Sequence, residues 1–197
     1  MKRIFSGFWS GCTVTELIIS AVFIALIIIL THILAIQPPF VRISLSFLPV
    51  AVLAMRFGPL KAAIAAAAAD ILGCLIFTPG LYFPGFTLSA FLSGLFYGLA
   101  LYRKQPSIKR ITMATLAIFL FIDLFLNTLW LTLLYQKAMQ TILGGRLIKA
   151  LIMLPVQISL IYLITSRLAK YGLYDIKNPA AKLPKGVKLV NVTTGKT

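Results

Sequence analysis

The stretch that decides the fold is residues 17–36, which read LIISAVFIALIIILTHILAI. It contains no charged residue, and the charges that flank it are Glu16 and Arg42. A helix needs about 20 consecutive apolar residues to cross the hydrocarbon core of a bilayer. No small-residue cleavage site follows the run, so we interpret it as a transmembrane helix and not as a signal peptide.

The composition extends this interpretation to the rest of the chain. Of the 197 residues, 60% are hydrophobic and 12% are charged, whereas roughly 25% of an ordinary soluble domain is charged. Soluble enzymes and soluble binding modules are therefore excluded. The net charge is +15, from 19 Lys and Arg against 4 Asp and Glu. These basic residues separate apolar runs, so we expect a lipid bilayer as the partner and no nucleic acid.

Five further apolar stretches follow, which predicts an all-α integral membrane protein with six transmembrane helices. Pro and Gly residues break the chain at 78–86, and polar connectors lie at 103–110 and 137–149. The second stretch is short and contains Pro49, so we expect a tilted or broken helix there. The six expected spans are residues 17–36, 43–55, 62–77, 87–102, 111–136 and 150–166.

The basic residues also predict the orientation. With six spans and the N-terminus inside, only four of the 19 basic residues lie outside. These four are Arg42, Lys137, Arg146 and Lys149. The positive-inside rule then places both termini in the cytoplasm, whereas five spans would leave a basic tail outside. We expect a membrane domain over residues 1–170 and a basic, poorly ordered cytoplasmic tail over residues 171–197.

The sequence lacks the common patterns of catalysis. It contains no HExxH motif, no Cys/His cluster and no Gly-rich phosphate loop. Its single histidine, His32, lies in the first apolar run and is interpreted as a packing residue. We therefore expect no metal, no cofactor and no enzymatic activity, and a function driven by ATP would require partner subunits.

Two acidic residues, Asp70 and Asp123, lie inside expected spans. A charge at mid-membrane costs roughly 2.5–3.5 kcal/mol on insertion scales, so it usually faces a cavity or a partner. Either residue can bind a ligand or join two helices by an internal hydrogen bond. We favour the ligand role for Asp70, and both roles stay open for Asp123.

The outer side carries few cations and several aromatic residues. Arg42, Arg146 and Lys149 can together receive an anionic group, although each also suits the water-facing end of a span. An aromatic belt at the membrane interface accounts for some of the aromatic residues, and a planar ligand stacked between rings is the sharper alternative. The aromatic residues expected near this side are Phe40, Tyr82, Phe83, Phe86, Tyr97 and Trp130.

Ala21 and Ala25 form an AxxxA pair in the first span. Residues four apart lie on one face of a helix, and small side chains there let another helix approach closely. That helix can belong to this chain or to a partner.

Several short segments occur in an order and spacing typical of a known family. They are PFVRIS at 39–44, FPGFTLSA at 83–90, LNTLWL at 126–131, RLIK at 146–149 and LP at 154–155. From about residue 15 to residue 168, the chain resembles the substrate-binding (S) components of energy-coupling factor (ECF) vitamin transporters. The resemblance is strongest to the folate-specific members.

This resemblance implies a six-helix S-component bundle in a bacterial cell membrane. Such a bundle binds folate in a pocket open to the outside and associates with an integral coupling subunit and two ABC ATPases. The pair Ala21 and Ala25 matches the position of the coupling contact. The pterin suits the aromatic residues with Asp70 and Asn127, and the two carboxylates of folate suit the outer cations. The implied substrate-binding residues are Phe40, Arg42, Asp70, Tyr82, Thr87, Tyr97, Asn127, Trp130, Arg146 and Lys149.

Two alternatives stay open at this point. The first is an S component for another vitamin. Riboflavin lacks carboxylates, and biotin and pantothenate have one carboxylate each and are less aromatic than folate. The second is a small intramembrane enzyme or a secondary transporter, but we find no paired acid and base, and no inverted repeat between residues 1–103 and 104–197.

Overall fold

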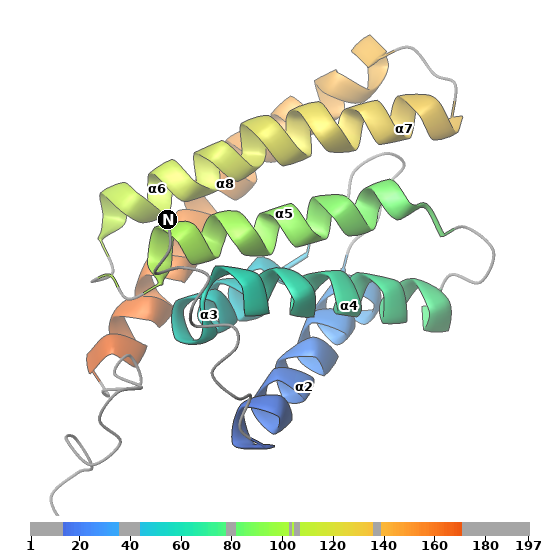
Figure 1. Cartoon of the computed structure of the whole chain (residues 1–197). Helices are drawn as coiled ribbons and strands as arrows, with labels where there is room; N and C mark the ends of the chain where they lie inside the picture. The colour runs from blue at the N-terminus through green and yellow to red at the C-terminus, as the bar shows by residue number, and fades with distance from the viewer. Residues whose placement is uncertain are drawn as a thin grey trace, which may run out of the picture.

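The computed structural model describes residues 14–35, 44–77, 82–102, 104, 107–135 and 139–170. In these ranges every regular element is a helix, and there is no strand. Helices α4 (Pro59–Phe77), α5 (Pro84–Leu101) and the long helix ending in α7 (Asn127–Tyr135) lie side by side (Figure 1). Helix α2 (Val14–Ile28) crosses them obliquely, and α8 (Met139–Lys170) passes behind. The predicted all-α class is confirmed.

The bounds of the helices lie within a few residues of the first five expected spans, whereas α8 begins well before the sixth. The first span consists of α2 (Val14–Ile28) and the π-helical turn η1 (Ile29–Ile33) that extends it. The fifth span consists of α6 (Ile108–Ala117), the π-helical segment η2 (Ile118–Leu126) and α7 (Asn127–Tyr135), which follow one another without a break. The remaining elements are α3 (Phe47–Phe57), α4 (Pro59–Phe77), α5 (Pro84–Leu101) and α8 (Met139–Lys170).

Four helices in the described ranges are long and apolar enough to cross a membrane. They are Val14–Ile33, Pro59–Phe77, Pro84–Leu101 and Ile108–Leu134. Two shorter apolar helices, Phe47–Phe57 and Ile152–Leu168, occupy the places of the second and sixth expected spans. The count of six spans and the cytoplasmic location of both termini stay predictions, and the tail at 171–197 lies outside the described residues.

The second expected span, which was predicted to be tilted or broken, is a continuous helix, α3. Pro49 does not break it, because it lies in the first turn, where its missing N–H has no partner to lose. Two other local expectations were wrong. Helix α5 begins at Pro84, inside the expected loop, because the fixed φ of proline suits the first helical position. Most of the connector expected at 137–149 is helical, since α8 begins at Met139. Its two glycines cost only about 1 kcal/mol each relative to alanine, which does not stop a long helix.

Helices α4 and α5 approach each other unusually closely. Gly94 and Gly98 of α5 form a GxxxG pair that faces α4. A Cβ atom on Gly94 would lie 2.7 Å from the backbone oxygen of Ala62, and one on Gly98 would overlap the backbone of Pro59. Small residues at such a crossing let the two backbones touch, which is how helices associate without a hydrophobic driving force.

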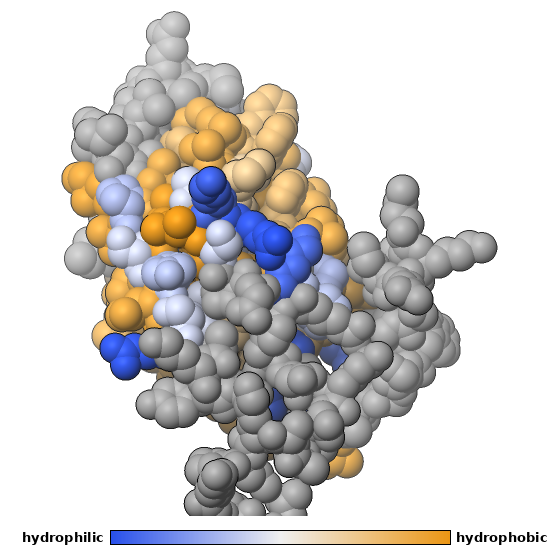
Figure 2. All heavy atoms as spheres, turned by 90° about the vertical axis from the view of Figure 1, so that its left-hand side faces the viewer, coloured by the Kyte–Doolittle hydropathy of each residue, from blue (hydrophilic) through white to orange (hydrophobic). Residues whose placement is uncertain are grey.

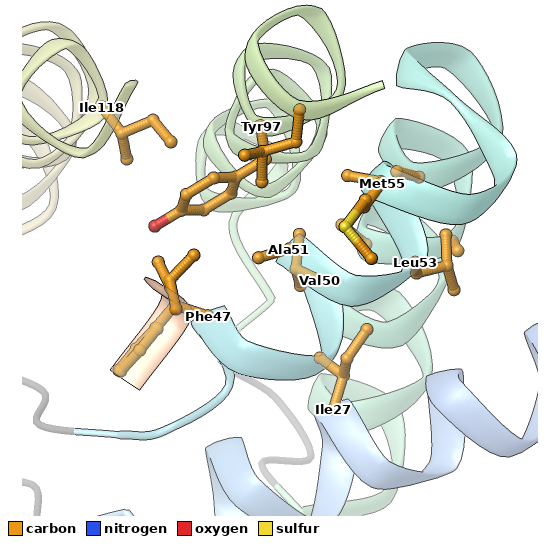
Figure 3. Close-up of a cluster of buried hydrophobic side chains, with 14 of the residues drawn as sticks. Ile27, Phe47, Val50, Ala51, Leu53, Met55, Tyr97 and Ile118 are labelled. Atoms are coloured by element: carbon orange, nitrogen blue, oxygen red, sulfur yellow. The ribbon is translucent and has the colours of Figure 1, made fainter. Parts of the chain in front are cut away.

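The core lies around the short helix α3. Five of its side chains and Ile27 of α2 point into one cluster, which Tyr97 of α5 and Ile118 of η2 close from the other side (Figure 3). By contrast, α2 exposes most of its apolar side chains, as a helix at the edge of a membrane bundle does. The labelled side chains of α3 are Phe47, Val50, Ala51, Leu53 and Met55.

The helix ends divide the bundle into two ends, which we name from the predicted orientation. The outer end holds the end of α4 at Phe77 and the start of α5 at Pro84 (Figure 1). The opposite, inner end carries a group of hydrophilic side chains (Figure 2). The exposed basic residues of the elements that end there are Lys104, Lys109, Arg110 and Arg167. Glu16 and Lys61 form an ion pair of 2.6 Å that ties the start of α2 to the start of α4.

Candidate functional site

Four of the predicted ligand residues lie wholly or partly outside the described residues. Phe40 and Arg42 fall between α2 and α3, in a range that the structure does not describe. Arg146 and Lys149 lie in the first half of α8, where only the backbone is described. The predicted site for the carboxylates of a ligand therefore stays a prediction.

Asp70 forms the first polar cluster at the outer end. Its Oδ2 accepts a hydrogen bond of 2.7 Å from the hydroxyl of Thr87, which joins α4 to α5. The hydroxyls of Thr87 and Tyr82 lie 3.0 Å apart. Threonine has one hydrogen to donate and a carboxylate only accepts, so Tyr82 donates to Thr87. Three predicted site residues thus form one hydrogen-bonded chain.

Trp130 of α7 forms a second cluster, on the start of α5. Its indole Nε1 donates to the hydroxyl of the buried Ser89 over 3.3 Å. Its ring centroid lies 5.6 Å from that of Phe83, which in turn meets Phe86 edge-on at 5.8 Å. A Cβ atom on Gly85 would lie 2.6 Å from Cδ2 of Trp130, so the glycine lets the indole lie directly on α5.

Asn127 lies on the same face of the helix as Trp130, one turn further from the outer end. Its Nδ2 donates to Oδ1 of Asp123 over 3.1 Å. Its Oδ1 is enclosed by protein and has no hydrogen-bond partner among the residues that the structure describes. Buried polar atoms without a partner are rare in folded proteins, so this oxygen is a candidate acceptor for a hydrogen bond from a ligand.

The two clusters lie on opposite sides of α5. Thr87 and Ser89 are two residues apart, which corresponds to about 200° around a helix. Thr87 faces Asp70 on α4, and Ser89 faces Trp130 on α7. The predicted site residues are therefore divided between two helix interfaces, and Asp70 has an internal hydrogen bond of the kind that joins helices.

Tyr97 belongs to neither cluster. It lies ten residues beyond Thr87 on α5, or about 15 Å along the helix axis. Its side chain is 3% exposed and points into the core between Phe47 and Ile118 (Figure 3). The ring therefore lies far from the outer side, where the sequence analysis expected it. The hydropathy pattern shows that Tyr97 belongs to a span but does not show its depth in the membrane.

Ser89, His32 and the pair Ala21 and Ala25 lie outside the two polar clusters of predicted ligand residues or were not predicted to belong to them. Ser89 was not predicted, because the hydroxyl becomes part of a site only through the pairing of α5 with α7. His32 stacks on Phe77 with ring centroids 5.4 Å apart and lies against Gly73, which agrees with a packing role. Ala21 and Ala25 are both exposed on α2, so none of the described helices covers their face.

The comparison with known proteins decides the family. Residues 15–165 match the family described as ECF transporter, substrate-specific component. The chain belongs to this family. An S component is a subunit of a membrane transporter, so this chain is a membrane protein and its family is not one of enzymes.

Individual relatives are consistent with this assignment. The folate transporter FolT of Clostridium novyi is 44% identical over 149 residues, which cover 76% of this chain and 87% of the relative. FolT of Leuconostoc mesenteroides is 31% identical over 153 residues, covering 75% and 82%. A crystal structure of FolT bound with folic acid has a TM-score of 0.76 at 35% identity, covering 79% of this chain and 95% of that one.

Proposed function

We propose that this S component binds folate in a bacterial cell membrane and delivers it to an ECF-type importer. The family assignment supports a substrate-binding subunit. Both named relatives are folate transporters, and the similar solved structure contains folic acid. Identities of 31% to 44% over at least three quarters of the chain favour folate over the other vitamins.

The observation that carries the proposal within this chain is the unpartnered Oδ1 of Asn127, which lies three residues before Trp130 on the same helix. A pterin is flat, so it can stack on aromatic side chains. It also carries N–H groups along one edge, and one of them can satisfy the buried acceptor. Phe83 extends the aromatic surface toward the outer end, where a ligand would enter.

In this proposal Asp70 joins two helices and does not bind the ligand. A single pterin ring cannot lie on both faces of α5, so placing it beside Trp130 leaves Asp70 to join α4 to α5 through Thr87. The carboxylates of the ligand would then meet Arg42, Arg146 and Lys149, since charge-assisted hydrogen bonds to a carboxylate are among the strongest in proteins.

The energy for uptake would come from partners. The sequence has no phosphate-binding loop of the P-loop type, so an integral coupling subunit and two ABC ATPases would complete the importer. Ala21 and Ala25 offer the coupling subunit a strip of small side chains on the exposed face of α2. Close helix packing in a membrane uses surfaces of this kind.

Fluorescence of Trp130 provides a direct test. The chain has two tryptophans, Trp9 and Trp130, so a Trp9→Phe variant reports on Trp130 alone. Folic acid added to this variant in detergent should quench its emission in a saturable manner, because the pterin would stack near the indole. Riboflavin, biotin and pantothenate should not compete. Saturable binding of another vitamin in the absence of folate binding would contradict the proposed function.

A further inference from the structure

The chemistry that Asn127 offers depends on which end of its amide faces the ligand. The nitrogen end carries two hydrogen-bond donors and the oxygen end carries only acceptors, so a rotation of the amide exchanges one for the other. In this structure the nitrogen end is held by Asp123, and the oxygen end is enclosed without a partner among the described residues.

Asp123 can hold only one of these two ends. A carboxylate accepts hydrogen bonds and donates none. If the Asn127 amide rotated, its oxygen would face the carboxylate oxygen of Asp123 with no hydrogen between them. The contact of 3.1 Å between Nδ2 and Oδ1 therefore fixes the amide with its acceptor directed away from Asp123.

The π-helical segment brings the two side chains together and holds them there. Asp123 lies within η2 and Asn127 follows its last residue, so both project from one face of the continuous helix. The backbone N–H of Asn127 donates to the carbonyl of Ile122, five residues back. The hydroxyl of Thr128 donates to the backbone carbonyl of Asp123 over 3.5 Å. Segments of π-helix are frequent at functional sites.

We propose that Asp123 is a positioning residue that sets the ligand specificity of the site. By holding the nitrogen end of the Asn127 amide, it makes this position an acceptor only, which selects a heterocycle with an amino or ring N–H group on its edge. This inference rests on the proposed function, because it takes the pterin of folate as that heterocycle. Asp123 itself does not contact the ligand.

The test is a double-mutant cycle on the full chain in detergent. Folate affinity is measured for the wild type, Asp123→Leu, Asn127→Leu and the double variant. Each single variant should bind about tenfold more weakly, because the ligand N–H then loses a correctly oriented acceptor. If Asp123 acts on the ligand through Asn127, the double variant should bind no more weakly than Asn127→Leu. Asp123→Asn, which restores an acceptor, should recover most of the affinity.

Ligand selectivity separates positioning from a general effect on the fold. Folate is compared with an analogue that lacks the 2-amino group and with one methylated on N3. The wild type should discriminate against at least one analogue, and the discrimination should shrink in Asp123→Leu and in Asn127→Leu. A lower melting temperature with unchanged discrimination would overturn the inference, and so would losses that multiply in the double variant.

The outcomes also distinguish this inference from the proposed function. If the wild type does not bind folate, the proposed function fails. If the wild type binds folate and Asp123→Leu binds it equally well, only the positioning role is overturned. Should Asp123→Leu fail to fold, Asp123→Ala answers the same question with a smaller side chain, judged by its affinity and its discrimination between the analogues.

Discussion

Gly85→Ala should weaken folate binding by displacing the indole of Trp130. The added Cβ atom would overlap Cε1 of Phe83 and lie 2.6 Å from Cδ2 of the indole, so both rings must move, the indole by about 1 Å to reach an ordinary contact distance. The hydrogen bond from Trp130 to Ser89 is already 3.3 Å long and would not survive that movement.

Two opposing energies decide the sign of this substitution. Alanine favours a helix over glycine by roughly 0.5–1 kcal/mol. Overpacking costs typically 1–3 kcal/mol, and the lost hydrogen bond adds about 0.5–1.5 kcal/mol. The unfavourable energies are larger, so the indole should not keep its position on α5. Because the proposed stacking surface for the pterin then moves, we expect folate affinity to fall about tenfold, which corresponds to about 1.4 kcal/mol.

The assay is a fluorescence titration in the Trp9→Phe background, where the emission of Trp130 also reports the movement of the ring. Leu88→Ala is the control, because Leu88 lies in the same turn of α5 but is 48% exposed. Ser89→Ala removes the hydrogen bond without adding bulk and should show a smaller loss. Wild-type affinity in Gly85→Ala, together with a shifted Trp130 emission, would show that this aromatic cluster does not bind the ligand.

Three further tests, each with its own substitutions, address the other assignments. Replacing both Ala21 and Ala25 by Trp should abolish uptake in cells that express the whole importer, while the isolated chain binds folate as before; normal uptake would mean that another face contacts the coupling subunit. Asp70→Asn should lower the melting temperature and change folate affinity by less than about twofold, because it disturbs a helix contact worth about 1.5–3 kcal/mol; a tenfold loss of affinity would restore Asp70 as a ligand residue. Arg42→Ala or Arg146→Ala should weaken binding of folate much more than binding of pteroate, which lacks the glutamate; equal losses would refute the carboxylate assignment.

Much of the helical architecture could be predicted because hydropathy is a local property. An uncharged run such as residues 17–36 must be helical in a bilayer, since no water is available there to satisfy its backbone groups. The short segments around Arg42, Trp130 and Lys149 likewise identified the family without any contact being known. The AxxxA pair could be assigned to one helix face from its spacing alone.

The composition of the site depended on how the helices pair. Sequence spacing does not reveal that Thr87 faces α4 while Ser89 faces α7, because this depends on how α5 is rotated between its two neighbours. The same pairing puts Tyr97 into the core.

The orientation of the Asn127 amide is also a product of tertiary structure. The sequence determined that an amide and a carboxylate lie four residues apart in one span. Only the folded chain, through the π-helical segment and the enclosure of Oδ1, decided which end of the amide is held and which end is left for a ligand. The physical reason is that a hydrogen bond needs both partners in place, and the burial that leaves one atom unpartnered comes from packing between helices.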